Sequence, residues 1–339
     1  MEYRNLGRSG LKVSSLCIGT MTWGISTDEE EAQRIVDEAL DHGINFFDTA
    51  NVYAQGASEE ILGRALARDG KRERCVVATK FTGRMGPGPN DSGSSRRHMM
   101  LACEASLRRL RTDWIDLYYV HFMDLETPLE EILQGLDDLV RQGKVRYIGT
   151  SKWVPSLIAE AVMASLHYGW ARFVAEQPPY NLLDRSIEKE LVWTCLRHGI
   201  GLVTWAPLAT GILSGQYQSV DDRPKGSRAE TGGISASRLT EGALERVRAL
   251  KPLAEARGLT LAQFALAWVR QQPGVTAPIL GVRTVEHLRS ALAIEEVRLT
   301  PEELQRVDEI APPGSAVSDY WDANTFRRLW PQVLRQWGR

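Results

Sequence analysis

The chain has 339 residues, enough for one large domain or two medium ones, and its hydrophobic content of 43% suits a protein with a full core. Its formal net charge of −2 leaves no global field that would recruit nucleic acid or an anionic membrane surface. No apolar run approaches the roughly 20 residues that a membrane-spanning helix needs, and Met1 to Arg4 are too polar for a secretory signal.

The elements predicted in chain order begin with a short hairpin, in which 3–6 and 11–13 flank a turn at 7–10. We expect this hairpin to act as a lid on one end of the domain. The next segments alternate between apolar strands and capped helices. The predicted strands are 16–20, 45–49, 75–80, 115–121, 145–150, 173–177, 201–205 and 276–280. The predicted helices are 28–42, 58–67, 96–110, one starting at 127–130 with Pro128 in its first turn, 155–168, 184–197, 241–257, 260–271, 285–293 and, as the last, 301–310.

Strands that alternate with helices indicate parallel pairing, and strands that are uniformly apolar indicate burial on both faces. Eight such units with no break in composition predict an α/β fold of the closed (β/α)8 TIM barrel type, with the N-terminal hairpin lid and extra helices. The alternative is an open doubly wound sheet, but the turn Gly-Thr-Met-Thr-Trp-Gly at 19–24 lacks the spacing of a dinucleotide fingerprint. We expect one barrel domain over 1–339, with a tail at about 312–339 over or beside the barrel mouth.

Two further features qualify this picture. The polar segment 211–238 is too long and too rich in Asp, Pro and Gly for regular structure, so it is either a functional lid or disordered.

The four cysteines are Cys17, Cys75, Cys103 and Cys195. None is spaced as in a metal knuckle or redox dithiol, so we expect no metal site and a reducing, cytoplasmic setting.

Polar residues follow three neighbouring strands where each strand should end. They are Asp48, then Tyr53 in the following loop, then Lys80, then His121. Each taken singly could be a residue of the solvent-exposed rim. Because the C-terminal strand ends of such a barrel meet at one face, the four together predict an active site.

The chemistry of these groups is specific. A tyrosine has an ordinary pKa of about 10, and a nearby lysine ammonium would lower it. Asp48 would hold Lys80 in place and keep it charged, and His121 would orient a carbonyl oxygen. Tyr53 is then a general acid aimed at that oxygen, and no nucleophile is present, which favours hydride or proton transfer.

The segment Gly-Ile-Asn-Phe-Phe-Asp-Thr-Ala-Asn-Val-Tyr at 43–53 resembles the signature of the aldo-keto reductase family, and the likeness covers essentially the whole chain. It is nearest to the long-chain branch of aryl-alcohol dehydrogenases and channel beta subunits. The resemblance implies reduction of an aldehyde or ketone to an alcohol by NAD(P)H held across the barrel mouth. It maps the catalytic tetrad onto Asp48, Tyr53, Lys80 and His121, with Tyr53 as the proton donor.

The resemblance also implies a cofactor site. Ser151 and Gln177 match residues that contact the nicotinamide amide, Trp205 matches the aromatic that stacks on its ring, and 211–215 offers N–H groups to the pyrophosphate. Arg283 suits a 2′-phosphate, so we expect NADPH, with NADH not excluded. The full set is Gly19, Thr20, Met21, Ser151, Lys152, Gln177, Trp205, Ala206, Pro207, Leu208, Gly211, Leu213, Gly215, Arg228, Gly281, Arg283 and His287.

The sequence departs from the family pattern where the cofactor phosphates should lie. The family commonly has lysine in place of Gln216, and it usually has Gln, Glu and Asn in place of His287, Ser290 and Ala291. We expect Arg228, and Arg289 as a further candidate, to compensate for the missing contacts.

The substrate is expected to be a small aldehyde or ketone, chosen by loops over the mouth. Candidate lining residues are Trp23, Met85, Phe122 and Met123, together with the tail aromatics Tyr320, Trp321, Phe326 and Trp330. The physiological substrate, the direction of the reaction and the oligomeric state stay open, a homo-oligomer included.

Two other functions remain as alternatives. One is a slow-turnover NADPH-binding regulatory subunit, although such family members have Asn at the position of His121. The other is a Schiff-base lyase that uses Lys80, which needs a neutral amine rather than one paired with Asp48.

Overall fold

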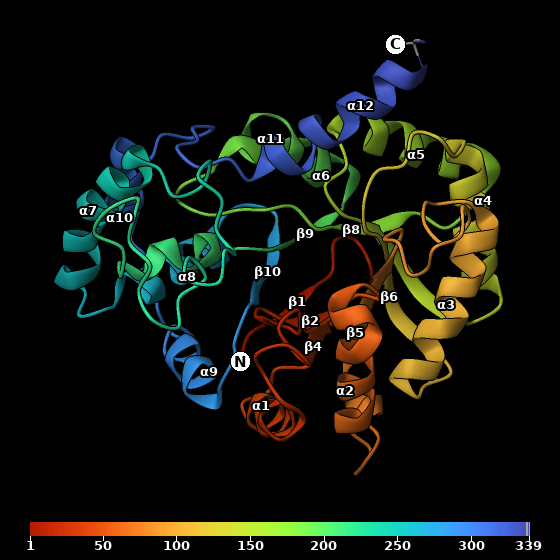
Figure 1. Cartoon of the computed structure of the whole chain (residues 1–339), viewed down its shortest axis with the longest axis horizontal. Coiled ribbons are helices and arrows are strands. Elements are labelled where there is room, and N and C mark those ends of the chain that lie inside the picture. Colours follow the sequence, from red (N-terminus) through yellow and green to blue (C-terminus); the bar gives the residue numbers. More distant parts are fainter. Residues whose placement is uncertain (337, 339) are drawn as a thin grey trace.

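The computed structural model describes residues 1–336 and 338. Eight parallel strands form a closed barrel in the order β10-β3-β4-β5-β6-β7-β8-β9, and helices surround it (Figure 1). This confirms the predicted (β/α)8 class. The barrel strands are β3 (Cys17–Gly19), β4 (Phe46–Asp48), β5 (Val76–Phe81), β6 (Ile115–Val120), β7 (Val145–Thr150), β8 (Phe173–Glu176), β9 (Gly201–Thr204) and β10 (Val275–Leu280).

Several of the helices begin where the sequence supplies a capping side chain. Asp28 accepts a hydrogen bond from the backbone N–H of Glu31 at the start of α1, and Thr260 and Thr300 form capping boxes at α8 and α10. The α-helices are α1 (Glu29–Asp41), α2 (Ala57–Leu66), α3 (Arg96–Leu110), α4 (Leu129–Arg141), α5 (Pro155–Tyr168), α6 (Leu191–His198), α7 (Glu241–Ala256), α8 (Leu261–Gln271), α9 (Val285–Leu292), α10 (Pro301–Ile310), α11 (Trp321–Asn324) and α12 (Phe326–Gln336). Four 3₁₀ segments join them: η1 (Tyr53–Gly56), η2 (Arg72–Arg74), η3 (Ser186–Lys189) and η4 (Ala209–Ser214).

The barrel interior is a packed core, because the side chains of each strand alternate between two faces. Along β5, Val76 and Ala78 lie in the interior cluster, whereas Val77 and Phe81 pack outward against the helices. The same alternation puts Phe46 of β4 inside and Phe47 outside. The strands therefore fix in advance which residues near their C-terminal ends face the barrel axis.

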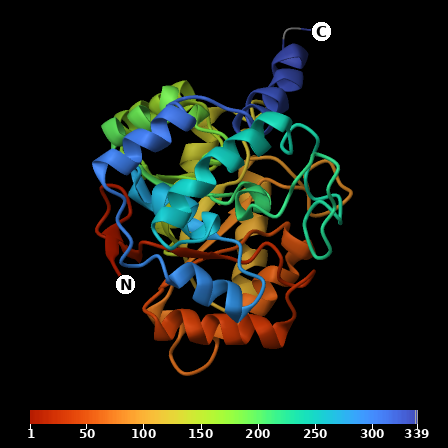
Figure 2. The same ribbon diagram turned by 90° about the vertical axis from the view of Figure 1, so that its left-hand side faces the viewer.

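The N-terminal hairpin consists of β1 (Tyr3–Asn5) and β2 (Lys12–Ser14) and closes the N-terminal end of the barrel. Gly7, at a φ of +55°, lies so close to the backbone of β8 and β9 that an added Cβ would stand 2.6 Å from the carbonyl oxygen of Val174. Leu6 and Val13 are fully buried in the barrel interior. Figure 2 shows this hairpin, in red, on the opposite side of the barrel from the long segment 211–238, in teal.

Some predicted elements were wrong in detail. The helix expected over 184–197 is divided into η3 and α6, because Glu190 between them has a φ of −149°. Pro128 is the N-cap of α4 and not a residue of its first turn. The tail carries the unexpected helices α11 and α12. In 211–238, η4 is followed by turns, and Tyr217 and Ala229 pack into the core.

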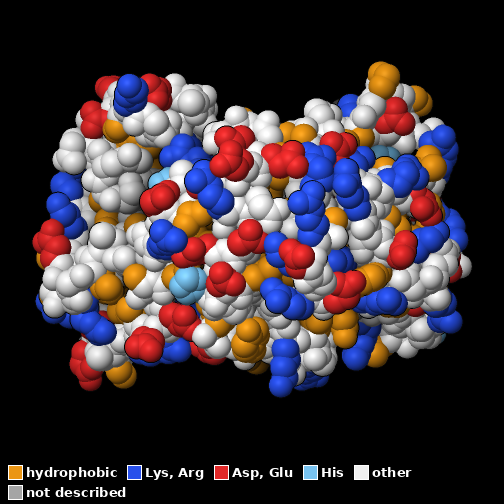
Figure 3. Space-filling view, turned by 90° about the horizontal axis from the view of Figure 1, so that it is seen from below, with side chains coloured by type: hydrophobic (Ala, Val, Ile, Leu, Met, Phe, Trp, Pro, Cys, Tyr) orange, Lys and Arg blue, Asp and Glu red, His pale blue; other side chains and the backbone are white. Residues whose placement is uncertain are grey.

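The charge pattern agrees with the composition. On the face in Figure 3, acidic and basic side chains are interspersed. None of the helices in the described part of the chain has the length and apolar character needed to cross a bilayer.

Candidate active site

Three of the four predicted catalytic residues point toward the barrel axis for one reason. Asp48, Lys80 and His121 each follow by two residues a side chain of the interior cluster, namely Phe46, Ala78 and Tyr119. The strand register pairs Asp48 with Ala78 and Lys80 with Tyr119. The polar side chains therefore lie above the apolar layers of the barrel interior, toward the C-terminal ends of the strands. The period of two along each strand thus converts three separate sequence positions into one cluster.

The centre of this cluster is a buried ion pair. The Lys80 Nζ lies 2.5 Å from Oδ1 of Asp48, and the two side chains are 0% and 3% exposed. The same Nζ donates to the Thr49 carbonyl at 2.7 Å and to the Tyr53 Oη at 3.3 Å. The Gln177 Nε2 donates to Oδ2 of Asp48 at 2.8 Å. The Lys80 ammonium is therefore held by a carboxylate on one side and aimed at the phenol on the other.

The loop after β4 brings Tyr53 back over the barrel. The Asn51 N–H donates to the Lys80 carbonyl at 3.1 Å, and the Tyr53 N–H donates to the Ala50 carbonyl at 3.1 Å. The next two residues, Ala54 and Gln55, have φ values of 46° and 55°, in the left-handed region that non-glycine residues rarely adopt. Such strain persists only where surrounding contacts impose it, and here it accompanies the turn that presents Tyr53.

Burial affects the pKa values of both Lys80 and Tyr53, which are in contact. Burial lowers the pKa of Lys80, but the charge of Asp48 and the Tyr53 phenol outweigh it, so the net pKa is raised. Burial raises the pKa of Tyr53, and the Lys80 charge opposes this only in part. The predicted lowering of the phenol's pKa was therefore wrong for the net direction, because desolvation exceeds the effect of the neighbouring ammonium.

His121 faces Tyr53 edge to face, with ring centroids 6.0 Å apart and planes at 83°. Its pKa is held well below the ordinary value by burial first, and then by the positive charges of Lys152, Lys80 and Arg328. His121 is thus a neutral imidazole at neutral pH. Its Nδ1 is buried and has no hydrogen-bond partner among the described residues.

Several of the residues predicted to contact the cofactor's nicotinamide lie beside this cluster. The Ser151 hydroxyl donates to the Gln177 carbonyl at 2.8 Å, and Gln177 reaches Asp48 as described. At β3, the Thr20 N–H donates to the Asp48 carbonyl at 2.9 Å, whereas Met21 is 43% exposed. The same register pairs Gly19 with Asp48.

Trp205 follows β9 and is partly buried. Its ring meets that of Tyr320 at 6.1 Å and 64°, and its Nε1 is buried with no partner among the described residues. An unpartnered indole N–H next to two aromatic rings suits a bound ring system that carries a hydrogen-bond acceptor.

The backbone after Trp205 contains a run of residues in the left-handed region, and the N–H groups of Ala209, Gly211, Leu213 and Gly215 donate to carbonyls within the same segment. Ala206, Ala209, Thr210, Gly211 and Gly215 have φ values of 53°, 49°, 53°, 100° and 77°. Pro207, Leu208 and Leu213 complete the segment, and Leu213 is buried in the core. The predicted pyrophosphate contacts fall on this segment, and Gln216 points an amide group toward Gly211.

Two arginines gather where the 2′-phosphate was predicted. The Arg228 Nη2 stands 4.0 Å from where a Cβ on Gly281 would lie, and the Arg283 Nη1 donates to the Gly226 carbonyl at 3.1 Å. The pKa of His287 is lowered by burial and by the charge of Arg283. Arg289 does not join them, because its guanidinium binds both oxygens of Glu38 at 2.7 and 3.0 Å.

The residues proposed to line the substrate pocket divide into two groups. Trp23 is fully buried, and Met123 is buried with its Sδ accepting from the Val154 N–H at 3.3 Å, so both are core residues. Met85 lines a cavity of about 220 Å³ beside α3 together with Asn51 and His98. Phe122 alone of the four stacks directly on His121, at 4.2 Å and 8°.

The tail supplies the remaining candidates. The Tyr320 Oη is 2.8 Å from the Thr210 hydroxyl, and the Tyr320 ring lies against Trp205. Trp321 is partly buried, and Phe326 and Trp330 stack on each other at 5.5 Å while remaining exposed. A residue that the sequence did not indicate, Arg328, lies over Phe122 at 3.4 Å.

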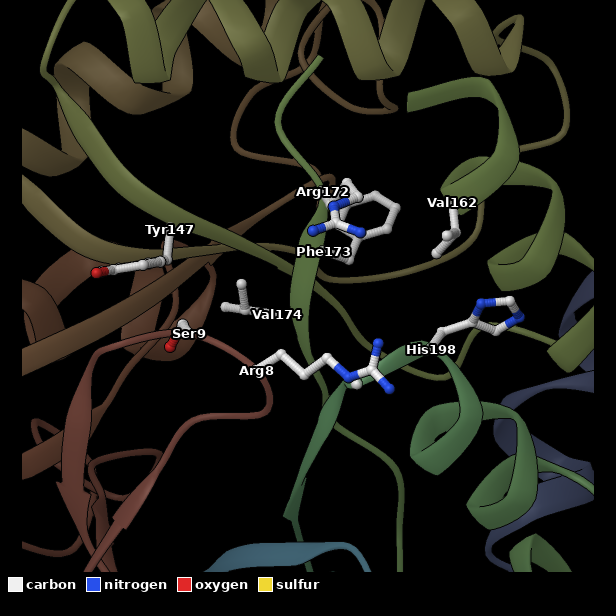
Figure 4. Close-up of a pocket in the computed structure, with 9 residues that line it drawn as sticks. Arg8, Ser9, Tyr147, Val162, Arg172, Phe173, Val174 and His198 are labelled. Atoms are coloured by element: carbon white, nitrogen blue, oxygen red, sulfur yellow. The ribbon is translucent and has the colours of Figure 1, made fainter. Parts of the chain in front are cut away.

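A cavity of about 260 Å³ lies away from this cluster, by the N-terminal ends of β8 and β9 (Figure 4). Arg8, Arg172 and His198 line it, and Figure 4 shows the Arg8 guanidinium directed toward His198. None of the predicted site residues contributes to it, so it belongs to the hairpin end of the barrel.

The structure is thus a closed (β/α)8 barrel that brings an aspartate, a tyrosine, a lysine and a histidine together near the C-terminal ends of its strands. The chain belongs to the aldo/keto reductase family, which matches residues 15–312. Family membership supports carbonyl reduction as the general activity, with small carbonyl compounds as substrates.

Three relatives illustrate the range of the family. An uncharacterized oxidoreductase of Bacillus subtilis, YrpG, is 41% identical over 328 residues, which cover 93% of this chain and 97% of the relative. A probable voltage-gated potassium channel subunit beta of Arabidopsis thaliana is 39% identical over 318 residues, covering 91% of this chain and 96% of the relative. Versiconal hemiacetal acetate reductase of Aspergillus parasiticus is 35% identical over 333 residues, covering 91% and 96%.

Proposed function

We propose that the protein reduces an aldehyde or ketone to an alcohol with NADPH, and that Tyr53 donates the proton. The observation that carries this proposal is the continuous contact from Asp48 through the Lys80 Nζ to the Tyr53 Oη, with the His121 ring edge to face with the phenol. A carbonyl oxygen placed between Tyr53 and His121 would meet an O–H donor and a neutral imidazole.

The roles follow from the charges. Because its pKa is raised by burial, Tyr53 keeps its proton at neutral pH until negative charge develops on the carbonyl oxygen. As the proton leaves, the Lys80 ammonium at 3.3 Å stabilises the developing phenolate, and this interaction is stronger in the transition state than in the ground state. Asp48 keeps Lys80 protonated and in place, and His121 orients the carbonyl.

The residues present fit a nicotinamide cofactor. When bound, NADPH supplies the hydride. Ser151 and Gln177 would hold the carboxamide, and Gln177 would exchange its bond to Asp48 for that contact. Trp205 would support the ring, and its unpartnered Nε1 is available as a donor.

The phosphate end of the cofactor fits as well. The left-handed run from Ala206 to Gly215 would cradle the pyrophosphate, with the neutral Gln216 amide in place of a lysine. Arg228 and Arg283 would bind the 2′-phosphate, which favours NADPH over NADH. All four cysteines are free and buried, which suits the cytoplasm as the setting of the reaction.

A second function deserves a test, because two kinds of relative match over similar lengths. Several relatives are named as potassium channel beta subunits, so a slow-turnover NADPH-binding regulatory subunit is the alternative. Stopped-flow mixing of the NADPH-loaded protein with a simple aldehyde separates the two. Rapid oxidation of NADPH supports the reductase, and its absence supports the binding subunit. A Schiff-base lyase is disfavoured, because the raised pKa of Lys80 keeps the amine protonated.

The direct test of the mechanism is Tyr53→Phe. We expect turnover to fall by about two or more orders of magnitude, the usual effect of losing a general acid, while NADPH still binds in a fluorescence titration. Tyr147→Phe is the matched control, because Tyr147 lines the cavity at the hairpin end of the barrel. Unchanged reduction by Tyr53→Phe would refute the mechanism.

A further inference from the structure

The helix α12 is fastened to the loop that follows His121. Its residues Arg328, Gln332 and Arg335 are spaced by four and three positions, so they share one face of the helix. The Gln332 Oε1 accepts from the Leu125 N–H at 2.9 Å, and the Arg335 Nη2 lies 2.7 Å from Oε1 of Glu126. The helix is labelled in Figure 1, in dark blue. These two contacts fix which face of the helix lies over the loop, and therefore where Arg328 points.

Arg328 stands over the aromatic wall beside the catalytic histidine. Its guanidinium carbon lies 3.4 Å from the centre of the Phe122 ring, and the Phe122 ring stacks at 4.2 Å on that of His121. The Lys152 Nζ lies 3.9 Å from the centre of the same Phe122 ring. Two cations thus converge on one phenyl ring, next to the imidazole proposed to orient the carbonyl.

Neither of these cations is paired with a carboxylate side chain among the described residues. By contrast, the adjacent Arg327 binds Asp319 at 2.9 Å, and Arg335 binds Glu126. Lys152 is 6% exposed, and burial first, followed by the charges of Arg328 and Lys80, holds its pKa well below the ordinary value. An anion bound beside Lys152 and Arg328 would favour the charged form of Lys152 and offset the repulsion between the two groups.

We propose that the substrate carries a carboxylate, held by Arg328 and Lys152, while its carbonyl lies between Tyr53 and His121. The planar guanidinium of Arg328 can bind both oxygens of a carboxylate, and the Lys152 ammonium adds a point charge. The substrate class is then an aldehyde or ketone that bears a carboxylate group a short distance from the carbonyl. This inference rests on the proposed reductase function and specifies the substrate of the same site.

The test compares two aldehydes that differ in charge and share a ring. The probes are 4-carboxybenzaldehyde, which is anionic at neutral pH, and its neutral methyl ester. Arg328→Gln should lower kcat/KM for the acid by about 10- to 100-fold, mainly through KM, because one charge-assisted bond to the substrate is lost. The ester should be reduced by the variant as it is by the unmodified protein.

Two further variants control for folding and for general charge effects. Arg327→Gln removes the neighbouring positive charge, which is bound to Asp319 and 66% exposed, and should leave both aldehydes unaffected. Arg328→Lys keeps the charge and should recover part of the lost affinity for the acid. Equal effects of Arg328→Gln on the acid and the ester, or no effect on either, would overturn the inference and leave the reductase function standing.

Failure of the reductase function is a separate outcome. If the unmodified protein reduces neither aldehyde, binding of 4-carboxybenzaldehyde in the presence of NADP⁺ is measured by calorimetry instead. Weaker binding by Arg328→Gln than by Arg327→Gln would still support recognition of the carboxylate. Identical binding by both variants would overturn it.

Discussion

Replacing Asp48 by asparagine keeps the shape of the side chain and removes the charge that faces Lys80. The pair is not a surface ion pair, because its atoms are 2.5 Å apart and the two side chains are 0% and 3% exposed. After the change the Lys80 Nζ retains only neutral partners, the Thr49 carbonyl at 2.7 Å and the Tyr53 hydroxyl at 3.3 Å. The buried ammonium is then uncompensated.

The expected loss of stability is large for one substitution. Breaking a buried pair costs about 3–5 kcal/mol, whereas an exposed pair contributes about 0–1 kcal/mol. Burial already lowers the pKa of Lys80, and in the unmodified protein the Asp48 charge is the first of the groups that oppose it. In Asp48→Asn we therefore expect the folded-state pKa of Lys80 to fall below its unfolded value of about 10.4.

The sign of the pH dependence follows from proton binding. Between the depressed folded pKa and the unfolded pKa, the unfolded variant binds more protons, so the stability of the variant rises with pH. In the unmodified protein the pKa of Lys80 is raised, so its contribution is complete below the unfolded pKa and is lost only above it. The stability difference between the two proteins should consequently narrow as the pH rises from about 6 to 9.

Urea denaturation at the two ends of this range measures the effect. The control is Asp69→Asn, because Asp69 is 80% exposed and its contact with Lys71 is long, at 3.8 Å. Removing the Asp69 charge should therefore shift neither denaturation midpoint. A stability difference for Asp48→Asn that is small, or that does not change with pH, would show that Lys80 is not held charged by Asp48. Carbonyl reduction by the variant should also fall by about 10²-fold or more, since a Lys80 with a depressed pKa and without its carboxylate partner stabilises the Tyr53 phenolate less.

Three other outcomes are expected. The rate of reduction should be flat from about pH 6 to 9, because the pKa of His121 is well below and that of Tyr53 above its ordinary value. Arg283→Gln should weaken NADPH about 10- to 100-fold and NADH much less in a fluorescence titration, since a phosphate contact is lost. Gly149→Ala should destabilise the barrel by about 1–3 kcal/mol in urea, because its Cβ would lie 2.6 Å from Tyr119 and 2.8 Å from a backbone oxygen.

Each of these has an opposing result. A fall in rate centred near neutral pH would mean that His121 titrates there. Equal weakening of NADPH and NADH binding by Arg283→Gln would contradict the assignment of the 2′-phosphate to Arg283. Arg289→Gln is the control, because Arg289 is bound to Glu38, and the same effect from it would also contradict the assignment. Gly10→Ala is the control for Gly149, because a Cβ there meets nothing within 4 Å, and an equal loss from both would contradict the packing argument.

The barrel and the central cluster were predictable because both depend on short-range periodicity. A period of two along β4, β5 and β6 places Asp48, Lys80 and His121 on the barrel axis once the strands are parallel. The parallel arrangement follows from the alternation with helices. No detail of packing is needed for that step.

The net pKa of Tyr53 was not predictable in the same way. The presence of a lysine can be seen in the sequence, but the removal of the phenol from water depends on how the loop folds over the barrel. The structure shows that this second effect is the larger one. The sequence indicated a proton donor, and packing determines how tightly it holds its proton.

The tail was the least predictable part. Pro331 within α12 argues against a helix on local grounds. The contacts that hold α12 come from the loop at Leu125 and Glu126, about 200 residues earlier, as the separations of 207 and 209 positions show. Such tertiary contacts override local propensity and leave no signal in the nearby sequence, so Arg328 could not be assigned to the site from the sequence.

The N-terminal hairpin has a consequence for how the chain is made. The Arg4 Nη1 donates to the carbonyls of Arg270 and Val275, which lie 266 and 271 positions downstream. At about 5–20 residues per second, a ribosome needs on the order of tens of seconds to supply those partners. The hairpin therefore emerges long before its partners and docks only after they are made, and until then Leu6 and Val13 lack their place in the barrel interior. Mutations that weaken the hairpin should lower the yield of folded protein during synthesis more than they affect the chemistry at the other end.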